Sequence, residues 1–241
     1  MQIKLMELSV VVPVYNEYDN LLDLTEKIIN ALTGRIKPFE IIYVDDGSTD
    51  GSSELLDQLA DNYRQVRVIH FTANNGQTAA FAAGFERAQG KLIATLDADL
   101  QVDPVDILKF LPYIRDYDLV VGIRVNRRDN FIKKISSRIG NGVRNWLTNE
   151  DIKDTGCPLK LFKREVVQDL ELFDGMHRFF PTLAKMKGYK VTEVPVDHYP
   201  RKHGQSKYGI SNRMWRGLLD TLAVRWMKKR KISYQIKEEE E

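Results

Sequence analysis

The sequence predicts an α/β fold: a mostly parallel β-sheet flanked by helices, followed by amphipathic helices toward the C-terminus. Short apolar, β-branched runs alternate with helical patterns from residue 8 to about 123. This alternation is typical of a parallel sheet with helices on both faces. The runs are apolar throughout, as expected of strands buried on both sides. Polar or acidic segments follow four of the runs, and ligands collect at the carboxyl ends of parallel strands.

The expected elements can be placed in chain order. Strands are expected at 9–14, 40–44, 66–71, 92–96 and 119–122. Helical spacing of apolar residues predicts helices at 21–32, around 55–59, at 78–88 and from Pro104 onward. Either Ser48 or Asp50 can cap the second of these helices. Beyond residue 124 we expect a basic amphipathic stretch, a mixed α+β part (about 155–197), a Gly-rich basic loop (about 198–209) and a final helix (about 211–230).

Charge is distributed unevenly along a chain whose formal net charge is only +2. Residues 1–123 hold 10 Lys/Arg and 19 Asp/Glu, whereas 124–144 hold seven basic residues against one acid, and 201–230 hold nine against one. An acidic part can hold a cation, and basic segments can hold phosphates or face an anionic surface. The acidic part would oppose a polyanion and no recognised motif is present, so we expect no nucleic-acid partner.

Cysteine content and hydropathy bear on the compartment. Cys157 is the only cysteine, so an intramolecular disulfide is impossible, which fits a reducing compartment. The N-terminus lacks the apolar core of a signal peptide, and no run of 18 apolar residues predicts a transmembrane helix. We therefore expect a protein that can lie on a membrane without crossing it.

The acidic cluster Asp97-Ala98-Asp99-Leu100-Gln101 follows the fourth expected strand. Taken alone, Asp-x-Asp is more typical of a solvated loop. Asp45 and Asp46 end another strand, however, and are expected on the same rim, where four acids without a cation would repel one another. Hard divalent cations prefer oxygen ligands, and magnesium often bridges one or two carboxylates to phosphate. The cluster therefore predicts a Mg²⁺ or Mn²⁺ site.

Three motifs together resemble a known family: Pro13-Val14-Tyr15-Asn16-Glu17, Val44 to Asp50 (VDDGSTD), and Asp97 to Gln101 (DADLQ). They are similar to the family 2 inverting glycosyltransferases of the GT-A fold. Within that family the chain resembles the polyprenyl-phosphate glycosyltransferases of the dolichol-phosphate mannose synthase type, from about residue 8 to about 227. Narrower features are Gly122-Ile123-Arg124 with Arg138, and the loop from Arg201 to Tyr208.

The resemblance implies a donor site for a nucleotide-sugar. A UDP-sugar is favoured and GDP-mannose comes second. The implied pocket for base and ribose comprises Pro13, Tyr15, Glu17, Asp45 and Asp46. The implied metal ligands are Asp99 and Gln101 together with Asp97, and Asp97 also contacts the ribose or sugar. The residues implied to close over the donor diphosphate are Arg201, Ser206 and Lys207.

The resemblance also implies an acceptor, a dolichyl or undecaprenyl phosphate clamped by Arg124 and Arg138. Arginine offers a planar fork suited to phosphate. A phosphate monoester is largely ionised near neutral pH, so this acceptor needs no dedicated general base. A saccharide hydroxyl is the alternative acceptor and would need a base, for which Asp154 is the candidate. A non-catalytic membrane-surface binding module is a third reading.

A membrane surface is the other expected partner. Trp215, Leu219, Leu222 and Trp226 share one helical face beside basic residues, and 131–147 has a similar pattern. Alternatively these faces pack on the domain or on a second subunit, which would make a homo-oligomer. We expect a single domain over 1–230, with a donor half at 1–123, an acceptor- and membrane-facing half at 124–230, and a charged tail at 231–241. The expected location is cytoplasmic and peripheral, on the inner face of the membrane.

Overall fold

The computed structural model describes residues 6–125, 142, 145, 151–202 and 210–232, and of residues 210–216 only the helical backbone. The strands are β1 (Leu8–Val14), β2 (Phe39–Asp45), β3 (Val66–His70), β4 (Leu92–Thr95), β5 (Leu119–Val125), β6 (Lys160–Lys163) and β7 (Val191–Asp197). They form one sheet in the order β3-β2-β1-β4-β6-β5-β7. Neighbouring strands are parallel except for β6, which is antiparallel to both β4 and β5.

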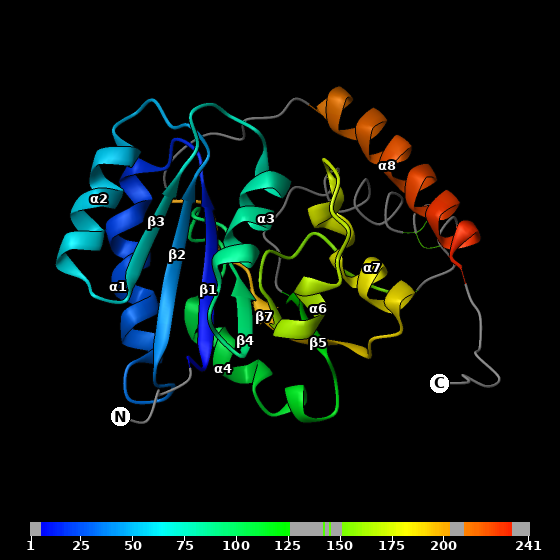
Figure 1. Cartoon of the computed structure of the whole chain (residues 1–241), viewed down its shortest axis with the longest axis horizontal. Helices are drawn as coiled ribbons and strands as arrows, with labels where there is room; N and C mark the ends of the chain where they lie inside the picture. Colours follow the sequence, from blue (N-terminus) through cyan, green and yellow to red (C-terminus); the bar gives the residue numbers. More distant parts are fainter. Residues whose placement is uncertain (1–5, 126–141, 143–144, 146–150, 203–209, 233–241) are drawn as a thin grey trace, which may run out of the picture.

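Helices cover both faces of this sheet (Figure 1). The α-helices are α1 (Tyr18–Leu32), α2 (Ser52–Asn62), α3 (Gln77–Arg87), α4 (Ile107–Phe110), α6 (Arg164–Gln168), α7 (Phe180–Lys187) and α8 (Ile210–Arg230). Three short 3₁₀ helices accompany them: η1 (Pro104–Asp106), η2 (Tyr113–Arg115) and η3 (Met176–Phe179). One core cluster joins α1, α2 and α4 to the sheet, and the other joins α3, α6, α7 and α8 to the opposite face.

The strand β1 shows why the central strands must be apolar on both sides. Val10 and Val12 belong to the core cluster under α1, whereas Val11 belongs to the cluster under α3. The small residues of α3 let this helix approach closely. A Cβ on Gly84 would lie 2.3 Å from a Val11 methyl group, so a larger residue there would force the helix away from the strand. The helix α3 therefore holds its N-terminal end firmly at the carboxyl edge of the sheet.

The predicted α/β class, a mostly parallel sheet flanked by helices, is confirmed, with three differences of detail. The reversed strand β6 lies between β4 and β5, so the fourth and fifth predicted strands run in the same direction but are not neighbours. The helix expected from Pro104 is broken into η1, α4 and η2. The helix α2 begins after Gly51, and Asp50 accepts a hydrogen bond from Ser52 N, whereas Ser48 bonds elsewhere.

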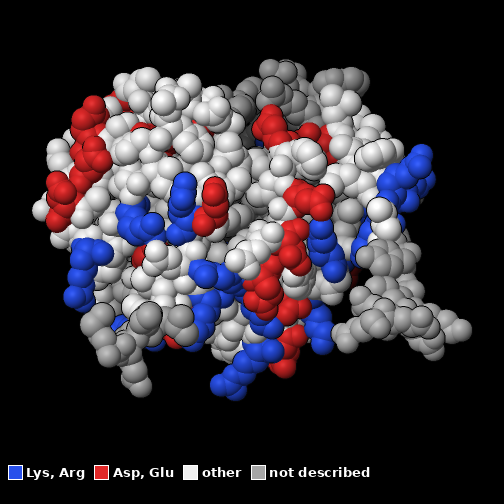
Figure 2. Space-filling model, viewed as in Figure 1, with Lys and Arg blue, Asp and Glu red and all other residues white. Residues whose placement is uncertain are grey.

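The C-terminal helix α8 packs with one side on the domain and leaves the other exposed. Val224 and Thr221 are buried against the core, and Asp220 lies over the backbone of Gly175. Among the described residues, no helix combines the length and apolar character needed to span a bilayer. Acidic side chains gather over α2 and basic ones over the distal part of α8, at opposite edges of the view in Figure 2. Between these two edges, acidic and basic side chains are interspersed on this face.

Candidate active site

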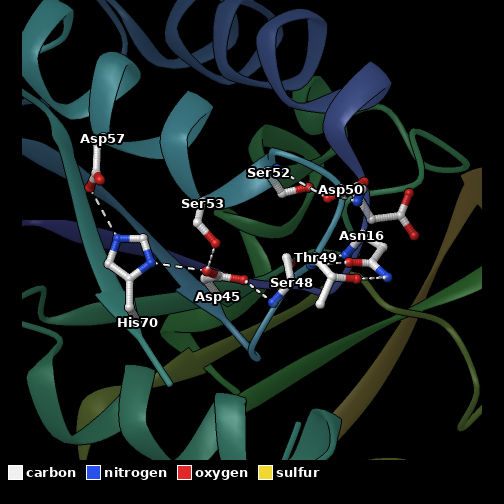
Figure 3. Close-up of polar contacts among 10 residues, drawn as sticks. Asn16, Asp45, Ser48, Thr49, Asp50, Ser52, Ser53, Asp57 and His70 are labelled. Carbon is white, nitrogen blue, oxygen red and sulfur yellow. Dashed lines mark hydrogen bonds and ion pairs between the residues drawn. The ribbon is translucent and has the colours of Figure 1, made fainter. Parts of the chain in front are cut away.

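The loops after β1 and β2 interlock at the carboxyl edge of the sheet (Figure 3). Asn16, which has a left-handed φ of 54°, donates from its backbone N to Ser48 Oγ at 3.0 Å and accepts from Thr49 N at 2.7 Å. The backbone N–H of Glu17 donates to Ser52 Oγ at 3.0 Å. The first two sequence motifs thus form one structural unit, which fixes Tyr15 and Glu17 at the rim.

The carboxylate of Asp45 lies inside this unit rather than on an open rim. It is 1% exposed and accepts hydrogen bonds from Ser48 N (3.0 Å), Ser53 Oγ (2.5 Å) and His70 Nδ1 (2.9 Å). Burial alone would raise the pKa of Asp45, but these donors outweigh burial and lower it. His70 also contacts Asp57 at 3.0 Å, and despite desolvation the two carboxylates raise the pKa of His70.

Asp46 organises the loop after β3. Its two carboxylate oxygens accept from Asn75 N at 2.6 Å and from Gly76 N at 2.9 Å. Burial is the main cause of the raised pKa of Asp46, and these two donors counteract it only in part. Gly47 is required here, because its φ is 71° and a Cβ would lie 2.6 Å from the carbonyl carbon of Ala73.

Asp97 and Asp99, after β4, have their own set of partners. Gln77, the first residue of α3, donates from Nε2 to Asp97 Oδ1 at 2.8 Å. Asp99 Oδ1 accepts from Gln101 N at 3.1 Å, and Leu100 between them has a left-handed φ of 58°. Burial, followed by the charge of Asp99, raises the pKa of Asp97 to about 7. The two carboxylates therefore repel each other where an added positive charge would stabilise both.

Residues 199–202, here called the strap, lie across this acidic pair. Tyr199 N donates to the carbonyl oxygen of Gln101 at 2.9 Å. Arg201 places Nη2 2.9 Å from Asp99 Oδ2 and Nη1 3.7 Å from Glu17 Oε1. Lys202 pairs with Asp23 on α1 at 2.8 Å. The strap thereby joins the first and third sequence motifs.

The donor set at Asp97 and Asp99 suits a hard divalent cation. Two carboxylates and the side-chain amide of Gln101 offer oxygen ligands of the type that Mg²⁺ and Mn²⁺ prefer. Across the ranges that the structure describes, no three acidic, His or Cys side chains are close enough to hold an ion alone. The expected rim of four acids is therefore not observed, because Asp45 and Asp46 accept hydrogen bonds from their own donors, Asp45 from Ser48, Ser53 and His70 and Asp46 from the loop after β3. A cation here would complete its shell with phosphate oxygens and water.

On the other side of Asp97 lies a buried ion pair. Arg124, in β5, donates from Nε and Nη2 to the two carboxylate oxygens of Asp154 at 2.8 and 2.9 Å, and its backbone N donates at 3.2 Å. A Cβ on Gly156 would lie 3.0 Å from Arg124 Nη2, so the glycine lets the guanidinium lie against the backbone. Both Arg124 and Lys160 are close enough to act electrostatically on Asp97.

Comparison with known proteins identifies the family. Residues 9–171, more than half of the chain, match the family described as "Glycosyl transferase family 2". The chain belongs to glycosyl transferase family 2. This family 2 chain is 39% identical over 225 residues to dodecaprenyl-phosphate galacturonate synthase of Rhizobium johnstonii, covering 91% of the chain and 66% of that relative. It is 38% identical over 204 residues to undecaprenyl-phosphate 4-deoxy-4-formamido-L-arabinose transferase of Edwardsiella ictaluri, covering 84% and 63%. The family 2 chain thus spans just under two thirds of the length of these curated relatives.

Solved structures confirm the GT-A fold. Glucosyl-3-phosphoglycerate synthase from Mycobacterium tuberculosis, crystallised with Mn²⁺, UDP and phosphoglyceric acid, aligns with a TM-score of 0.69 at 18% identity. The alignment covers 91% of the family 2 chain and 78% of the synthase. The mannosyltransferase PcManGT from Pyrobaculum calidifontis, solved with GDP-Man and Mn²⁺, aligns with a TM-score of 0.65 at 20% identity, covering 92% and 64%. At these identities the likeness establishes the fold.

The structure brings most of the predicted site residues of this family 2 chain to one edge of the sheet. Pro13, Tyr15 and Glu17 lie at the end of β1, and their role at the base and ribose stays a prediction. Arg138, Ser206 and Lys207 lie outside the described residues, as does most of the amphipathic stretch 131–147.

Sequence reasoning did not predict the contacts of four residues at this edge. Gln77 orients Asp97, and His70 bridges Asp45 and Asp57. Lys160 is buried and donates from Nζ to the carbonyl oxygen of Cys157, and burial lowers its pKa. His177 contacts Thr78 Oγ1 through Nδ1 at 2.7 Å, and burial lowers its pKa to about 3. A polar residue at the first position of a helix after a strand was the available signal for Gln77. The contacts of His70 with Asp45 and of His177 with Thr78 join residues 25 and 99 positions apart, too distant in sequence to pair by inspection. The contact of Lys160 is local, but its burial depends on the whole fold.

Proposed function

We propose that this chain is an inverting glycosyltransferase that moves a sugar from a nucleotide-sugar to a polyprenyl phosphate at a membrane surface. The closed pair of Arg124 and Asp154 beside Asp97 carries the proposal. A saccharide hydroxyl would need a base to remove its proton. Both oxygens of Asp154, the candidate base, already accept hydrogen bonds from Arg124. A phosphate acceptor needs a fixed cation instead of a base.

Arg124 meets the requirements of such a cation. Its guanidinium is held on one edge by Asp154, and the largely buried side chain keeps an exposure of 16%. Because two hydrogen bonds fix the plane of the group, little side-chain entropy is lost when it binds an anion. A phosphate monoester held here would present an ionised oxygen as the nucleophile. Arg138 is the proposed second arginine of this clamp.

The donor half supplies the complementary part. Asp97 and Asp99, with Gln101, would hold Mg²⁺ or Mn²⁺, which as a Lewis acid neutralises charge developing on the departing nucleoside diphosphate. Gln77 keeps Asp97 oriented by its 2.8 Å hydrogen bond. Arg201 is positioned to reach the same diphosphate. Asp97 therefore lies between the proposed donor and the proposed acceptor clamp, where the sugar would be transferred. A UDP-sugar is the favoured donor and GDP-mannose the second.

The outer face of α8 supports membrane contact. Leu218, Leu219, Leu222 and Trp226 are exposed there, the last to 63%. Lys228, Lys229 and Arg230 follow at the end of the helix and are exposed as well. An apolar stripe with a basic end suits the interface of an anionic leaflet, because apolar side chains enter the acyl boundary and cations attract the headgroups. The proposed location is therefore peripheral, on the cytoplasmic face.

The relatives support the acceptor class. The two curated relatives are named for sugar transfer involving dodecaprenyl and undecaprenyl phosphate. The test is incubation of the purified chain with radiolabelled nucleotide-sugars, Mn²⁺ and anionic vesicles containing undecaprenyl phosphate. We expect label in an organic-extractable product that mild acid hydrolyses. Label appearing only in water-soluble saccharides, with no lipid labelled by any donor, would refute the proposed acceptor. Thermal-shift screening of UDP- and GDP-sugars with and without Mn²⁺ identifies the donor, because ligands of the native state raise its apparent stability.

A further inference from the structure

We propose that Arg201 is the counter-ion of Asp99 in the cation-free protein and competes with the divalent cation for that carboxylate. On this inference, Arg201 moves from Asp99 to the donor diphosphate when cation and nucleotide bind together. The inference deepens the proposed function, because it rests on a nucleoside diphosphate as the leaving group.

The geometry of the pair supports a built contact rather than a chance surface contact. Arg201 Nη2 lies 2.9 Å from Asp99 Oδ2, within the range of a charge-assisted hydrogen bond. The side chains of Asp99 and Arg201 are only 9% and 28% exposed. A carboxylate that is this well covered is costly to leave without a positive partner. The same guanidinium reaches Glu17 through Nη1 at 3.7 Å, so it neutralises two acids of the site.

A backbone hydrogen bond holds the strap beside the acidic pair. Tyr199 N, two residues before Arg201, is bonded to the carbonyl oxygen of Gln101, a predicted metal ligand. Lys202 pairs with Asp23 on the surface of α1, but the two side chains are 54% and 38% exposed, so this ion pair contributes little to holding the strap. The backbone therefore keeps the guanidinium near the acidic pair, and a partner change requires only that the side chain rotates.

A divalent cation and the guanidinium cannot share Asp99 without cost. Asp99 Oδ2 already accepts from Arg201, and Oδ1 accepts from Gln101 N. A cation that takes Oδ2 displaces Arg201 and places two positive groups side by side, which is unfavourable where solvent screening is weak. A diphosphate removes this cost, because its oxygens complete the cation's shell and offer the displaced arginine a bidentate anion.

Two consequences follow for binding. The cation alone binds weakly, because it must first break the contact of Arg201 with Asp99. Cation and nucleotide strengthen each other's binding, and part of this coupling depends on Arg201. Removal of Arg201 should therefore have opposite effects on two ligands: tighter binding of the cation alone and weaker binding of the nucleotide in the presence of the cation.

The experiment compares Arg201→Gln with Lys202→Gln. The two variants remove the same unit charge from adjacent residues of the strap, but Lys202 contacts Asp23 instead of Asp99. Free Mn²⁺ is measured by its paramagnetic resonance signal during titration, without nucleotide and then with UDP or GDP. We expect R201Q to bind Mn²⁺ alone about tenfold more tightly, equivalent to about 1.4 kcal/mol, and to lose affinity for the nucleotide. K202Q should stay within about twofold of the wild type.

Several outcomes would overturn the inference. One is that R201Q binds Mn²⁺ alone no more tightly than K202Q, and another is that R201Q retains the full coupling between Mn²⁺ and UDP. Asp99→Asn must abolish the gain in the R201Q background. If R201Q does not fold, the Mn²⁺ affinity of the wild type is the test. The inference fails if neither UDP nor GDP changes the affinity of the wild type for Mn²⁺. Because these readouts need no acceptor, loss of lipid labelling with an intact Mn²⁺ shift would refute the proposed function alone.

Discussion

Replacement of Asp154 by asparagine tests the role given to the buried pair. Asp154 accepts three hydrogen bonds from Arg124, at 2.8, 2.9 and 3.2 Å, and its side chain is 8% exposed. An asparagine oxygen can replace only one carboxylate oxygen, and its NH₂ group would then face a guanidinium N–H. The variant therefore loses at least one charged hydrogen bond, worth about 1.5–3 kcal/mol, and leaves the arginine charge uncompensated.

We expect D154N to lower the free energy of unfolding by about 3 kcal/mol. This is the low end of the range for breaking a buried pair, because the partial exposure of Arg124 lets water compensate in part. Urea unfolding followed by circular dichroism measures the loss. The matched control is Asp151→Asn, which breaks the pair with Lys185 at 2.6 Å, where the aspartate side chain is 88% exposed. This control should stay within about 0.5 kcal/mol of the wild type, and equal stability of the two variants would refute the reasoning.

The same variant separates positioning from proton removal. If Asp154 only positions Arg124, D154N lowers turnover but keeps the pH dependence of the remaining activity. If Asp154 is a general base, the acid limb of the pH–rate profile disappears with the carboxylate. The profile measured with a radiolabelled donor and vesicle-bound acceptor therefore decides between a phosphate and a hydroxyl nucleophile.

Three further predictions concern other parts of the molecule. Leu222→Glu should weaken sedimentation with anionic vesicles at least tenfold, because it places a charge on the proposed membrane face of α8. The control Leu22→Glu on α1 should not weaken it, although Leu22 is exposed to 49% and Leu222 to 45%. Equal loss in both variants would contradict a membrane face on α8. Gly47→Ala should destabilise the protein by about 3 kcal/mol in urea unfolding, because left-handed strain adds to contact with backbone, and a loss below about 1 kcal/mol would show that the loop relaxes. Because its carboxylate partners raise the pKa of His70, its protonated form stabilises the fold fully below about pH 6.5, and this contribution is lost as pH rises through the folded-state pKa. His70→Asn should therefore reduce the fall in Tm above pH 6.5, and an unchanged Tm profile would contradict it.

The fold was predictable because its signals are local. Apolar runs such as 9–14 and 40–44 have no polar face, so they require cover on both sides, and the helices between them supply it. The strand β6 was not predicted, because it comprises only Lys160–Lys163 and has a lysine at each end. Its place between β4 and β5 depends on pairing with β4, more than 60 residues earlier in the chain, and with β5, about 40 residues earlier, which periodicity does not report.

The site was predictable at the level of residues but less so at the level of roles. The carboxyl ends of the parallel strands lie at one edge of the sheet, and four acids lie there as expected: Asp45, Asp46, Asp97 and Asp99. Which of them face a ligand depends on partners elsewhere in the chain. Asp45 is enclosed by donors from α2 and β3, whereas Asp99 meets an arginine 102 residues away. Composition and spacing do not contain these pairings, so the expected single rim of acids was wrong.

The reversed direction of β6 has a consequence for how such a protein can diversify. The strand β6 is antiparallel to its neighbours, so it starts at the edge of the sheet where they end. The segment that leads into β6, with Asp154 and Gly156, therefore reaches this edge separately from the loops that follow the parallel strands. The parallel strands present one set of groups to that edge, and this segment presents another. The two sets belong to different stretches of the chain. Under the proposed assignment of Arg124 and Asp154 to the acceptor, substitutions next to this pair should alter acceptor choice while the proposed nucleotide-facing loops stay unchanged.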